Sequence, residues 1–274
     1  MNHPIAVITG ASSGIGRAYA RFLAEKGHDV VLIARRKNKL KELAKEIQEA
    51  YQTRVEIFTA DLSASEDAGK VYHKILQEWQ PEVLVHAAGF GTRGHVVEIK
   101  PELLEQQVYL HNVAAAMLAR AALPVMKDRK TGVLIFVSSV AAYISTAEYT
   151  VYSSTKAFLN TLATGLRDEL AGTDIKVQAV CPGITRTEFM YTEQYQENNF
   201  DYSFIPDKFW MEPEEVVKES WKRLTHRYRP VVVAGRMNKV LVGLLSWPVV
   251  GPLFRRRISR MVRKKVAKGL PSGF

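Results

Sequence analysis

The 274-residue sequence contains one cysteine, Cys181, which excludes an internal disulfide. A chain without disulfides fits a reducing compartment, and the first expected strand begins at Pro4, so we expect no signal peptide and a cytoplasmic location. Cys181 stands beside a proline at an expected strand end, where we interpret it as a small buried residue rather than a nucleophile. No linker, low-complexity tract or internal repeat divides the chain, and its length suits one large domain.

Acidic residues are missing from the last fifth of the sequence. Residues 220–274 contain fourteen Lys and Arg and no Asp or Glu, whereas the preceding 219 residues carry 24 basic and 28 acidic side chains. The net charge of +10 therefore belongs to the C-terminal region. A nucleic-acid-binding protein would carry its basic patch and a recognisable motif on the fold itself, so we expect no nucleic acid partner.

The apolar stretch near the C-terminus is too short to span a bilayer. Its uncharged part, residues 240–254, is 15 residues long and is broken by Pro248 and Pro252, whereas a spanning helix needs about 20. Eight basic residues follow within residues 255–268. Residues 237–268 therefore suit the surface of an anionic membrane, on its cytoplasmic face. The alternative is a helix pair that covers the substrate pocket or a subunit interface.

Apolar strands and helical patterns alternate along residues 1–235. Near-continuous apolar segments such as residues 30–34 indicate burial on both faces of a sheet, and strands separated by helices indicate parallel pairing. We therefore predict an α/β fold: a single Rossmann-type, doubly wound, mainly parallel seven-stranded sheet with helices on both faces. The expected strands are 4–9, 29–34, 54–59, 82–86, 132–138, 174–180 and 231–234. The expected helices are 14–26, 38–50, 65–79, 101–127, 152–171 and 213–225.

A glycine-rich turn joins the first expected strand to the first expected helix. The strand runs into Gly10-Ala-Ser-Ser-Gly-Ile-Gly16, and a helical pattern follows until Gly27. Glycines let a backbone approach a pyrophosphate, and a helix N-terminus supplies free N–H groups and a positive dipole. The spacing therefore predicts a dinucleotide cradle rather than an empty turn. Its residues are Gly10, Ser12, Ser13, Gly14, Ile15 and Gly16.

A second group of residues predicts a proton-transfer site. Tyr152 and Lys156 are four residues apart in an expected helix, which places them on one face, one turn apart. Ser139 stands at the end of an apolar strand, thirteen residues before Tyr152. The lysine charge is expected to lower the tyrosine pKa from about 10, and a proton donor works best when its pKa lies near the working pH.

Together these motifs resemble the short-chain dehydrogenase/reductase family. The resemblance covers roughly residues 4–190 and, more weakly, the chain to about residue 235. It implies that residues 1–235 form the NAD(P)-binding catalytic domain and that residues 236–274 are a C-terminal extension. It also implies further cofactor contacts, which are the adenine site at Asp61 and Leu62, the strand end at Ala88 and Gly89, and the nicotinamide carboxamide site at Pro182, Gly183, Thr185 and Thr187.

The same resemblance implies a role for each catalytic residue. Tyr152 would transfer the proton, and Lys156 would hold the nicotinamide ribose as well as tune the tyrosine. Ser139 would donate a hydrogen bond to the substrate oxygen, with Ser138 as the less favoured neighbour. Asn112 would connect Lys156 to a water and so to a proton path. Dimers or tetramers built on the helices at 101–127 and 152–171 are common in the family, so a homo-oligomer is expected.

Two positions depart from the family pattern. His86-Ala87 replaces the usual asparagine pair after the fourth strand, which puts the strand-end hydrogen bonds made there in doubt. Thr185 stands where the family prefers Ile or Val, a change we expect to be harmless because its backbone N–H remains. No metal is expected at the site.

The end of the second expected strand predicts the cofactor. An acidic residue at that position would accept hydrogen bonds from an adenosine ribose, whereas an arginine suits a 2′-phosphate. The sequence there is Ala34-Arg35-Arg36, so NADP(H) is preferred over NAD(H). Arg35 is the better candidate for the phosphate contact, with Arg36 stacked on adenine or solvated. The alternative is a surface charge run that continues into residues 37–41.

The long connection at residues 184–211 predicts a lid over the substrate. Loops of this length inside a compact domain are usually functional. Eight of its 28 residues are aromatic, which suits a bulky apolar substrate, although packing against the domain or a partner subunit is the alternative. We therefore predict an NADP(H)-dependent oxidoreductase that interconverts a secondary alcohol and a ketone on a small lipophilic molecule. The alternatives are a membrane-associated NADP(H) scaffold or sensor without catalysis, and an isomerase or dehydratase of the same family.

Overall fold

The computed structural model describes residues 3–144, 148–191, 206–248, 251–252 and 256–257. Within these residues seven parallel strands form one sheet in the order β3-β2-β1-β4-β5-β6-β7, as predicted. The strand order reverses between β1 and β4, which opens a crevice at the carboxyl ends of the strands. The strands are β1 (Ile5–Thr9), β2 (Asp29–Ala34), β3 (Val55–Thr59), β4 (Val83–His86), β5 (Thr131–Val137), β6 (Asp174–Cys181) and β7 (Val231–Val233).

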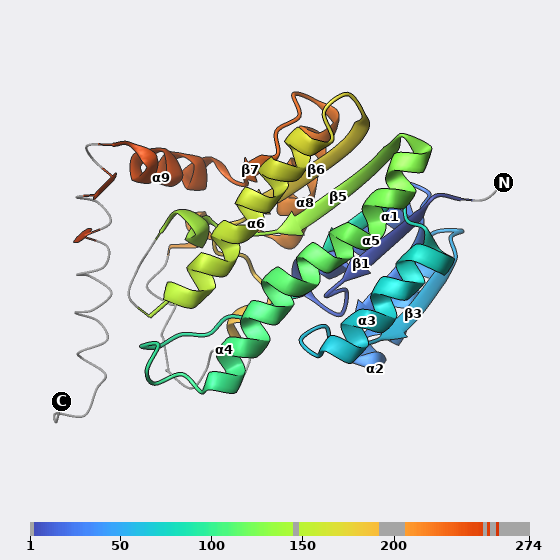
Figure 1. Cartoon of the computed structure of the whole chain (residues 1–274), viewed down its shortest axis with the longest axis horizontal. Helices are drawn as coiled ribbons and strands as arrows, with labels where there is room; N and C mark the ends of the chain where they lie inside the picture. The colour runs from blue at the N-terminus through green and yellow to red at the C-terminus, as the bar shows by residue number, and fades with distance from the viewer. Residues whose placement is uncertain (1–2, 145–147, 192–205, 249–250, 253–255, 258–274) are drawn as a thin grey trace.

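Helices cover both faces of the sheet, and the predicted helices are all present (Figure 1). One face carries α3 (Ser65–Lys74), α4 (Pro101–Val108), α5 (Ala114–Arg129) and α6 (Thr150–Glu169). The other face carries α1 (Gly14–Glu25), α2 (Lys37–Ala50) and α8 (Pro213–Thr225). Short turns of helix are η1 (Ile75–Trp79), η2 (Tyr109–Val113), η3 (Val140–Tyr143), η4 (Glu188–Tyr191) and η5 (Asp207–Phe209), and α9 (Arg236–Ser246) follows the last strand.

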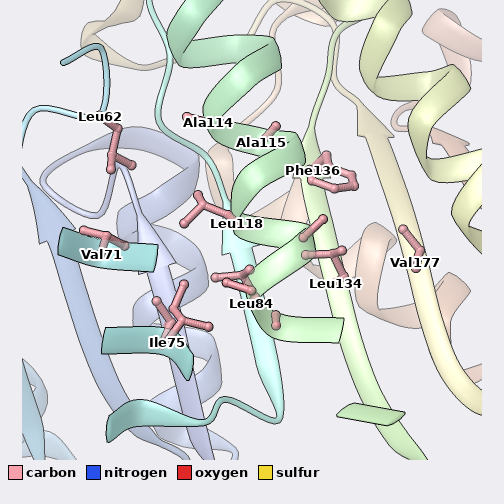
Figure 2. Packing of buried hydrophobic residues seen from close by; sticks show 14 of the residues in the cluster. Leu62, Val71, Ile75, Leu84, Ala114, Ala115, Leu118, Leu134, Phe136 and Val177 are labelled. Atoms are coloured by element: carbon pink, nitrogen blue, oxygen red, sulfur yellow. The ribbon is translucent and has the colours of Figure 1, made fainter. Parts of the chain in front are cut away.

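Two hydrophobic cores lie on opposite faces of the sheet. Successive strand residues point to opposite faces, so Val7 packs in one core and its neighbour Ile8 in the other. Figure 2 shows the first core, where Leu118 of α5 lies over Leu84 and Leu134 of the central strands. Because the strands are buried on both faces, they are apolar throughout, which explains why they were recognisable from the sequence.

A π-helical turn interrupts the long helix predicted at 101–127. The turn η2 separates α4 from α5 and contains His111 and Asn112. Such turns widen one helical turn and are frequent at functional sites. The whole helical run Pro101–Arg129 is long and apolar enough to cross a membrane, but its inward residues pack in the first hydrophobic core. We therefore assign it to the interior of the domain.

The first part of the C-terminal extension forms α9 and packs on the catalytic domain. Asn238 is buried, and its Nδ2 donates to the carbonyl oxygen of Ala234 at 2.7 Å. Gly183 lies so close to Asn238 that an added Cβ would come within 2.4 Å of the amide. The start of α9 therefore contacts one of the predicted cofactor motifs. Residues 249–250, 253–255 and 258–268 of the expected membrane segment lie outside the described residues.

Candidate active site

The predicted site residues surround one cavity at the carboxyl edge of the sheet. Its volume is about 680 Å³, and it is enclosed by the ends of the strands from β1 to β6 together with η3, η4 and α6. Every predicted cofactor residue lines it, as do Ser139, Tyr152 and Lys156. Asn112 does not line it. The structure thus brings together residues that are up to about 180 positions apart in the sequence, while their chemical roles stay predictions.

The glycine loop is packed closely against neighbouring atoms at all three of its glycines. Gly10 has φ +67°, and a Cβ there would lie 2.7 Å from the backbone of Ala87 and Ala88. A Cβ on Gly16 would lie 2.3 Å from the carbonyl oxygen of Gly10. This close packing places the N-terminus of α1 at the cavity, where its first N–H groups have no partner within the helix. The loop therefore fits the pyrophosphate of a dinucleotide.

Tyr152 and Lys156 share one face of α6, but the pKa of Tyr152 differs from the prediction. The ammonium of Lys156 donates to the carbonyl oxygen of Val137 at 2.9 Å and lies 5.6 Å from the centroid of the Tyr152 ring. Burial raises the pKa of Tyr152 to about 12, against a lowering effect of the hydrogen bond with Ser139. Burial also lowers the pKa of Lys156 to about 8. The expected lowering of the tyrosine pKa by lysine is therefore wrong for this structure, because burial dominates.

The two serines at the end of β5 have different surroundings. Ser138 is buried, and its hydroxyl donates to the carbonyl oxygen of Lys156 at 2.8 Å, which ties β5 to α6. Ser139 caps η3 by accepting a hydrogen bond from the N–H of Ala141 at 3.1 Å. Its hydroxyl also bonds Tyr152, the contact that moderates the tyrosine pKa. Ser139 is thus the serine that reaches the tyrosine, as predicted from its position.

A chain of hydrogen bonds from His111 supports the backbone of Tyr152. The N–H of Phe90 donates to His111 Nε2 at 3.2 Å, so Nδ1 carries the proton and donates to Thr155 Oγ1 at 2.8 Å. Thr155 in turn donates to the carbonyl oxygen of Tyr152 at 2.8 Å. Burial holds the pKa of His111 well below its usual value, with the charge of Lys156 as the next cause, so the ring is neutral. Sequence reasoning missed His111, although it directly precedes Asn112.

Asn112 occupies the π turn next to α6. Its Nδ2 donates to the carbonyl oxygen of Thr155 at 3.4 Å. Its Oδ1 is buried and has no hydrogen-bond partner among the described residues. A buried oxygen without a partner is expected to bind a water, which agrees with the predicted contact to a water but does not show a connection to Lys156.

His86 supplies the strand-end hydrogen bonds that its departure from the family pattern put in doubt. The ring is buried at the end of β4, with Nδ1 3.0 Å from Thr9 Oγ1 and Nε2 3.0 Å from the carbonyl oxygen of Leu110. Because a carbonyl only accepts, Nε2 carries the proton and Thr9 donates to Nδ1. Thr9 accepts from the N–H of Ala88 at 3.2 Å. Burial lowers the pKa of His86 to about 4, which keeps this neutral form.

The two arginines after β2 face different partners. Arg36 donates to Ser12 Oγ at 2.9 Å and Ser13 Oγ at 2.8 Å, so its guanidinium lies against the glycine loop. Arg35 is more exposed and has NH1 3.6 Å from a carboxylate oxygen of Asp61. Both line the cavity, but only Arg36 is held by the loop. The geometry therefore makes Arg36 at least an equal candidate for a phosphate contact, which the sequence alone assigned to Arg35.

A buried ion pair lies behind Tyr149 at the edge of the cavity. Arg93, in the loop after β4, has Nε 2.9 Å from a carboxylate oxygen of Glu148, and the two side chains are 4% and 5% exposed. Glu148 has a left-handed backbone (φ +70°) and stands two residues before α6. The guanidinium of Arg93 also lies 5.8 Å from the ring centroid of Tyr149, which lines the cavity. No sequence motif predicted this pair, because its two residues are 55 positions apart in the sequence.

The described ends of the predicted lid are fixed to each other. The N–H of Met211 donates to the carbonyl oxygen of Ile184 at 2.9 Å, and the N–H of Arg186 donates to that of Met211 at 2.9 Å. Phe189 extends from the first end to Tyr152, with ring centroids 5.9 Å apart. One predicted lid aromatic thus reaches the cavity. Residues 192–205, which include Tyr195, Phe200, Tyr202 and Phe204, lie outside the described residues.

Cys181 is buried at the end of β6, as interpreted from the sequence. Its Sγ donates to Asn160 Oδ1 at 3.2 Å, and burial raises the thiol pKa to about 11. A thiol with such a pKa stays protonated at neutral pH and is a poor nucleophile.

Comparison with known proteins supports the same family. A model of the short chain dehydrogenase family matches residues 4–198. An uncharacterised oxidoreductase of Staphylococcus saprophyticus is 33% identical over 184 residues, which are 67% of this chain and 79% of that protein. Another, from Staphylococcus aureus, is 32% identical over 69% of this chain and 80% of its own length.

Two solved structures are similar along almost the whole chain. A short-chain dehydrogenase from Sphingobium yanoikuyae in complex with NADPH has a TM-score of 0.77 and 29% identity, over 99% of this chain and 98% of its own. A bulky-bulky ketone specific alcohol dehydrogenase from Comamonas testosteroni has a TM-score of 0.74 and 26% identity, over 100% of this chain and 97% of its own. Both alignments therefore continue into the C-terminal extension.

Proposed function

Because this chain belongs to the short chain dehydrogenase family and is an oxidoreductase of that family, we propose that it interconverts a secondary alcohol and a ketone on a lipophilic substrate, with NADP(H) as the preferred cofactor. One observation carries the proposal. Ser139, Tyr152 and Lys156 line the same cavity as the glycine loop, so proton donor and cofactor cradle share one space. A binding protein would need the cradle alone.

Each residue has a defined task in the reduction. The bound nicotinamide supplies hydride chemistry, and the protein supplies position and a proton. The phenol of Tyr152, with a pKa of about 12, stays protonated at neutral pH and donates its proton to the developing alkoxide. Ser139 donates a hydrogen bond to the substrate oxygen, and Lys156 holds the nicotinamide ribose. The unpaired Oδ1 of Asn112 binds a water, and this water belongs to the path that returns a proton to Tyr152.

The substrate side of the cavity suits an apolar carbonyl compound. Tyr149, Phe189 and Ile144 line it beside Tyr152, and apolar walls with few polar groups are typical of sites for small lipophilic ligands. The similarity to a dehydrogenase described as specific for bulky-bulky ketones supports the same substrate class. The preference for NADP(H) draws support from Arg35 and Arg36 at the end of β2 and from the relative in complex with NADPH.

The surface supports two further parts of the proposal. Large apolar side chains are exposed on the run from α4 through η2 to α5 and on α6: Val108, Val113, Met117 and Phe158. This exposure is expected for a homodimer or homotetramer built on these helices. On α9, Met237 and Val240 are 45% and 59% exposed and lie three residues apart on one face of the helix, and Trp247, directly after the helix, is 57% exposed. An apolar face followed by the basic stretch suits peripheral attachment to an anionic membrane on the cytoplasmic side.

A carbonyl panel tests the activity. NADPH oxidation is followed by the loss of absorbance of the reduced nicotinamide, against apolar ketones of increasing size in dilute detergent. We expect turnover on a bulky ketone, and we expect Tyr152→Phe to abolish most of this turnover. Binding of NADPH without turnover on any ketone or alcohol would favour the scaffold alternative, and a product that keeps the oxidation state of its substrate would favour an isomerase or dehydratase.

A further inference from the structure

The part of the cavity beside Arg36, which we call the cofactor groove, already holds an anion, the carboxylate of Glu188. Glu188 begins η4, and its Oε2 accepts from NH1 of Arg36 at 2.6 Å, while Oε1 accepts from the ammonium of Lys39. The two cations stand at the start of α2, 152 and 149 residues away in the sequence, and Arg36 lines the cavity. These pairs, Lys39 first, lower the pKa of Glu188, so the carboxylate is ionised at neutral pH.

The surroundings fix both partners in place. Arg36 is also hydrogen-bonded to the hydroxyls of Ser12 and Ser13, so one edge of its guanidinium lies on the glycine loop while NH1 points to Glu188. Thr187, next to Glu188, packs against Gly14, where an added Cβ would lie 2.8 Å from Thr187 Cγ2. The segment that carries the carboxylate therefore lies directly on the cradle expected to bind the cofactor.

We propose that Glu188 is a cofactor-selectivity residue, whose carboxylate competes with the 2′-phosphate of NADPH for Arg36 and Lys39. This inference rests on the proposed function, because it takes a nicotinamide dinucleotide as the ligand. Two anions that share one pair of cations repel each other, so the phosphate binds only by displacing the carboxylate. NADH has no 2′-phosphate and leaves both ion pairs of Glu188 intact. Glu188 therefore weakens NADPH binding and reduces the preference for NADPH over NADH that the arginines create.

Binding measurements on the whole protein test this selectivity without turnover. Calorimetry gives the Kd of NADPH and NADH, and of the fragments 2′-AMP and 5′-AMP, for the wild type and Glu188→Gln. We expect the variant to bind NADPH and 2′-AMP about threefold to tenfold more tightly, the range for removing two exposed ion pairs. Its affinities for NADH and 5′-AMP should change less than about twofold, because neither ligand carries a 2′-phosphate for the carboxylate to repel.

Two further variants separate competition from a general charge effect. Glu46→Gln is the matched control, because Glu46 also accepts from two arginines, Arg17 and Arg21, but does not line the groove. It should leave all four affinities unchanged. Lys39→Met should weaken NADPH binding. It should also reduce the gain in NADPH affinity from Glu188→Gln when the two substitutions are combined, since one of the two shared cations is gone.

The outcomes are distinguishable from failure of the proposed function. If the wild type binds neither dinucleotide, the proposed function fails. If it binds both and Glu188→Gln leaves the ratio of the NADPH and NADH affinities unchanged, or lowers it, the competition is overturned. A gain that appears equally with NADH overturns it too, because Glu188 would then act on the groove as a whole.

Discussion

Lys156 is bonded to the backbone of Val137 rather than to the phenol of Tyr152. Its ammonium donates to the Val137 carbonyl oxygen at 2.9 Å, nineteen residues earlier in the chain. The end of β5 thus fixes the lysine, while α6 alone fixes the spacing between lysine and tyrosine. Because the ammonium is held by its own acceptor, the two residues should respond differently to substitution.

Tyr152→Phe should remove the proton donor and leave the fold unchanged. Turnover on an identified ketone should fall by about 10²-fold or more, as expected for loss of a general acid, while the Kd of NADPH changes little. Lys156→Ala should impair both, since the lysine is expected to hold the ribose and its loss removes the hydrogen bond to the Val137 carbonyl. Steady-state kinetics and dinucleotide titration give the two readouts. Turnover of the phenylalanine variant close to that of the wild type would exclude Tyr152 as the donor.

Arg36→Ala should weaken NADPH binding at least as much as Arg35→Ala. A charge-assisted contact contributes roughly 1.5–3 kcal/mol, which is about ten- to a hundredfold in affinity. Only Arg36 is held against Ser12 and Ser13, so its guanidinium is preorganised for a phosphate. Titration of each variant with NADPH and NADH measures the effect. Loss of the NADPH preference in Arg35→Ala alone would restore the assignment made from the sequence, and a wild type that prefers NADH would refute both.

His86→Asn should reduce the acid sensitivity of the fold. The folded pKa of His86 is about 4, below the ordinary 6.5, so between these values the unfolded chain binds a proton that the folded protein does not. Stability is therefore complete above about pH 6.5 and falls toward pH 4, by about 3 kcal/mol from this residue. Asparagine cannot be protonated and retains a donor and an acceptor for Leu110 and Thr9.

Urea unfolding at pH 7, 5.5 and 4.5 measures this dependence. His95→Asn is the control, because His95 is exposed in the loop after β4. The wild type and the control should lose stability in parallel, and His86→Asn should lose less. Parallel loss in all three proteins would show that another group, such as the buried His111, accounts for the acid response.

Glu148→Gln should destabilise the protein strongly because it leaves the charge of Arg93 buried. Removing one partner of a buried pair costs about 3–5 kcal/mol, and replacing both with apolar residues recovers much of that loss. We therefore expect Arg93→Met combined with Glu148→Leu to be more stable than Glu148→Gln in urea unfolding. Glu49→Gln, which breaks the exposed pair with Lys45, should cost less than about 1 kcal/mol. A double variant no more stable than the single variant would contradict this interpretation of the pair.

The intact protein should sediment with anionic vesicles at low salt. Each basic residue near such a surface contributes about 1 kcal/mol, and high salt should release part of the protein because it screens this attraction. Removing residues 255–274 should abolish the salt-sensitive part, and Val240→Asp with Trp247→Ser should abolish the rest. A protein that ignores these vesicles at every salt concentration has an extension that forms a subunit or pocket contact. Removal of residues 237–274 should then impair activity or assembly.

The sequence by itself determined the layered fold and the identity of most of the residues around the cavity. The strands of a parallel sheet are buried on both faces, so their apolar runs were visible without a structure. The glycine loop, Ser139 and the Tyr152-Lys156 pair follow from local rules, because strand ends and helix turns place such residues in known directions. These signals lie within a few neighbouring residues, which is why they could be read directly.

The tertiary structure alone decided the charges and hydrogen bonds between distant segments. Burial raises the pKa of Tyr152 above its usual value, the opposite of the direction expected from the nearby lysine. Glu188 reaches Arg36, and Arg93 reaches Glu148, across separations of 152 and 55 residues that no spacing rule covers. Desolvation and long-range pairing depend on what the folded chain packs around a group. A linear pattern specifies the group, and only the packed interior specifies its surroundings.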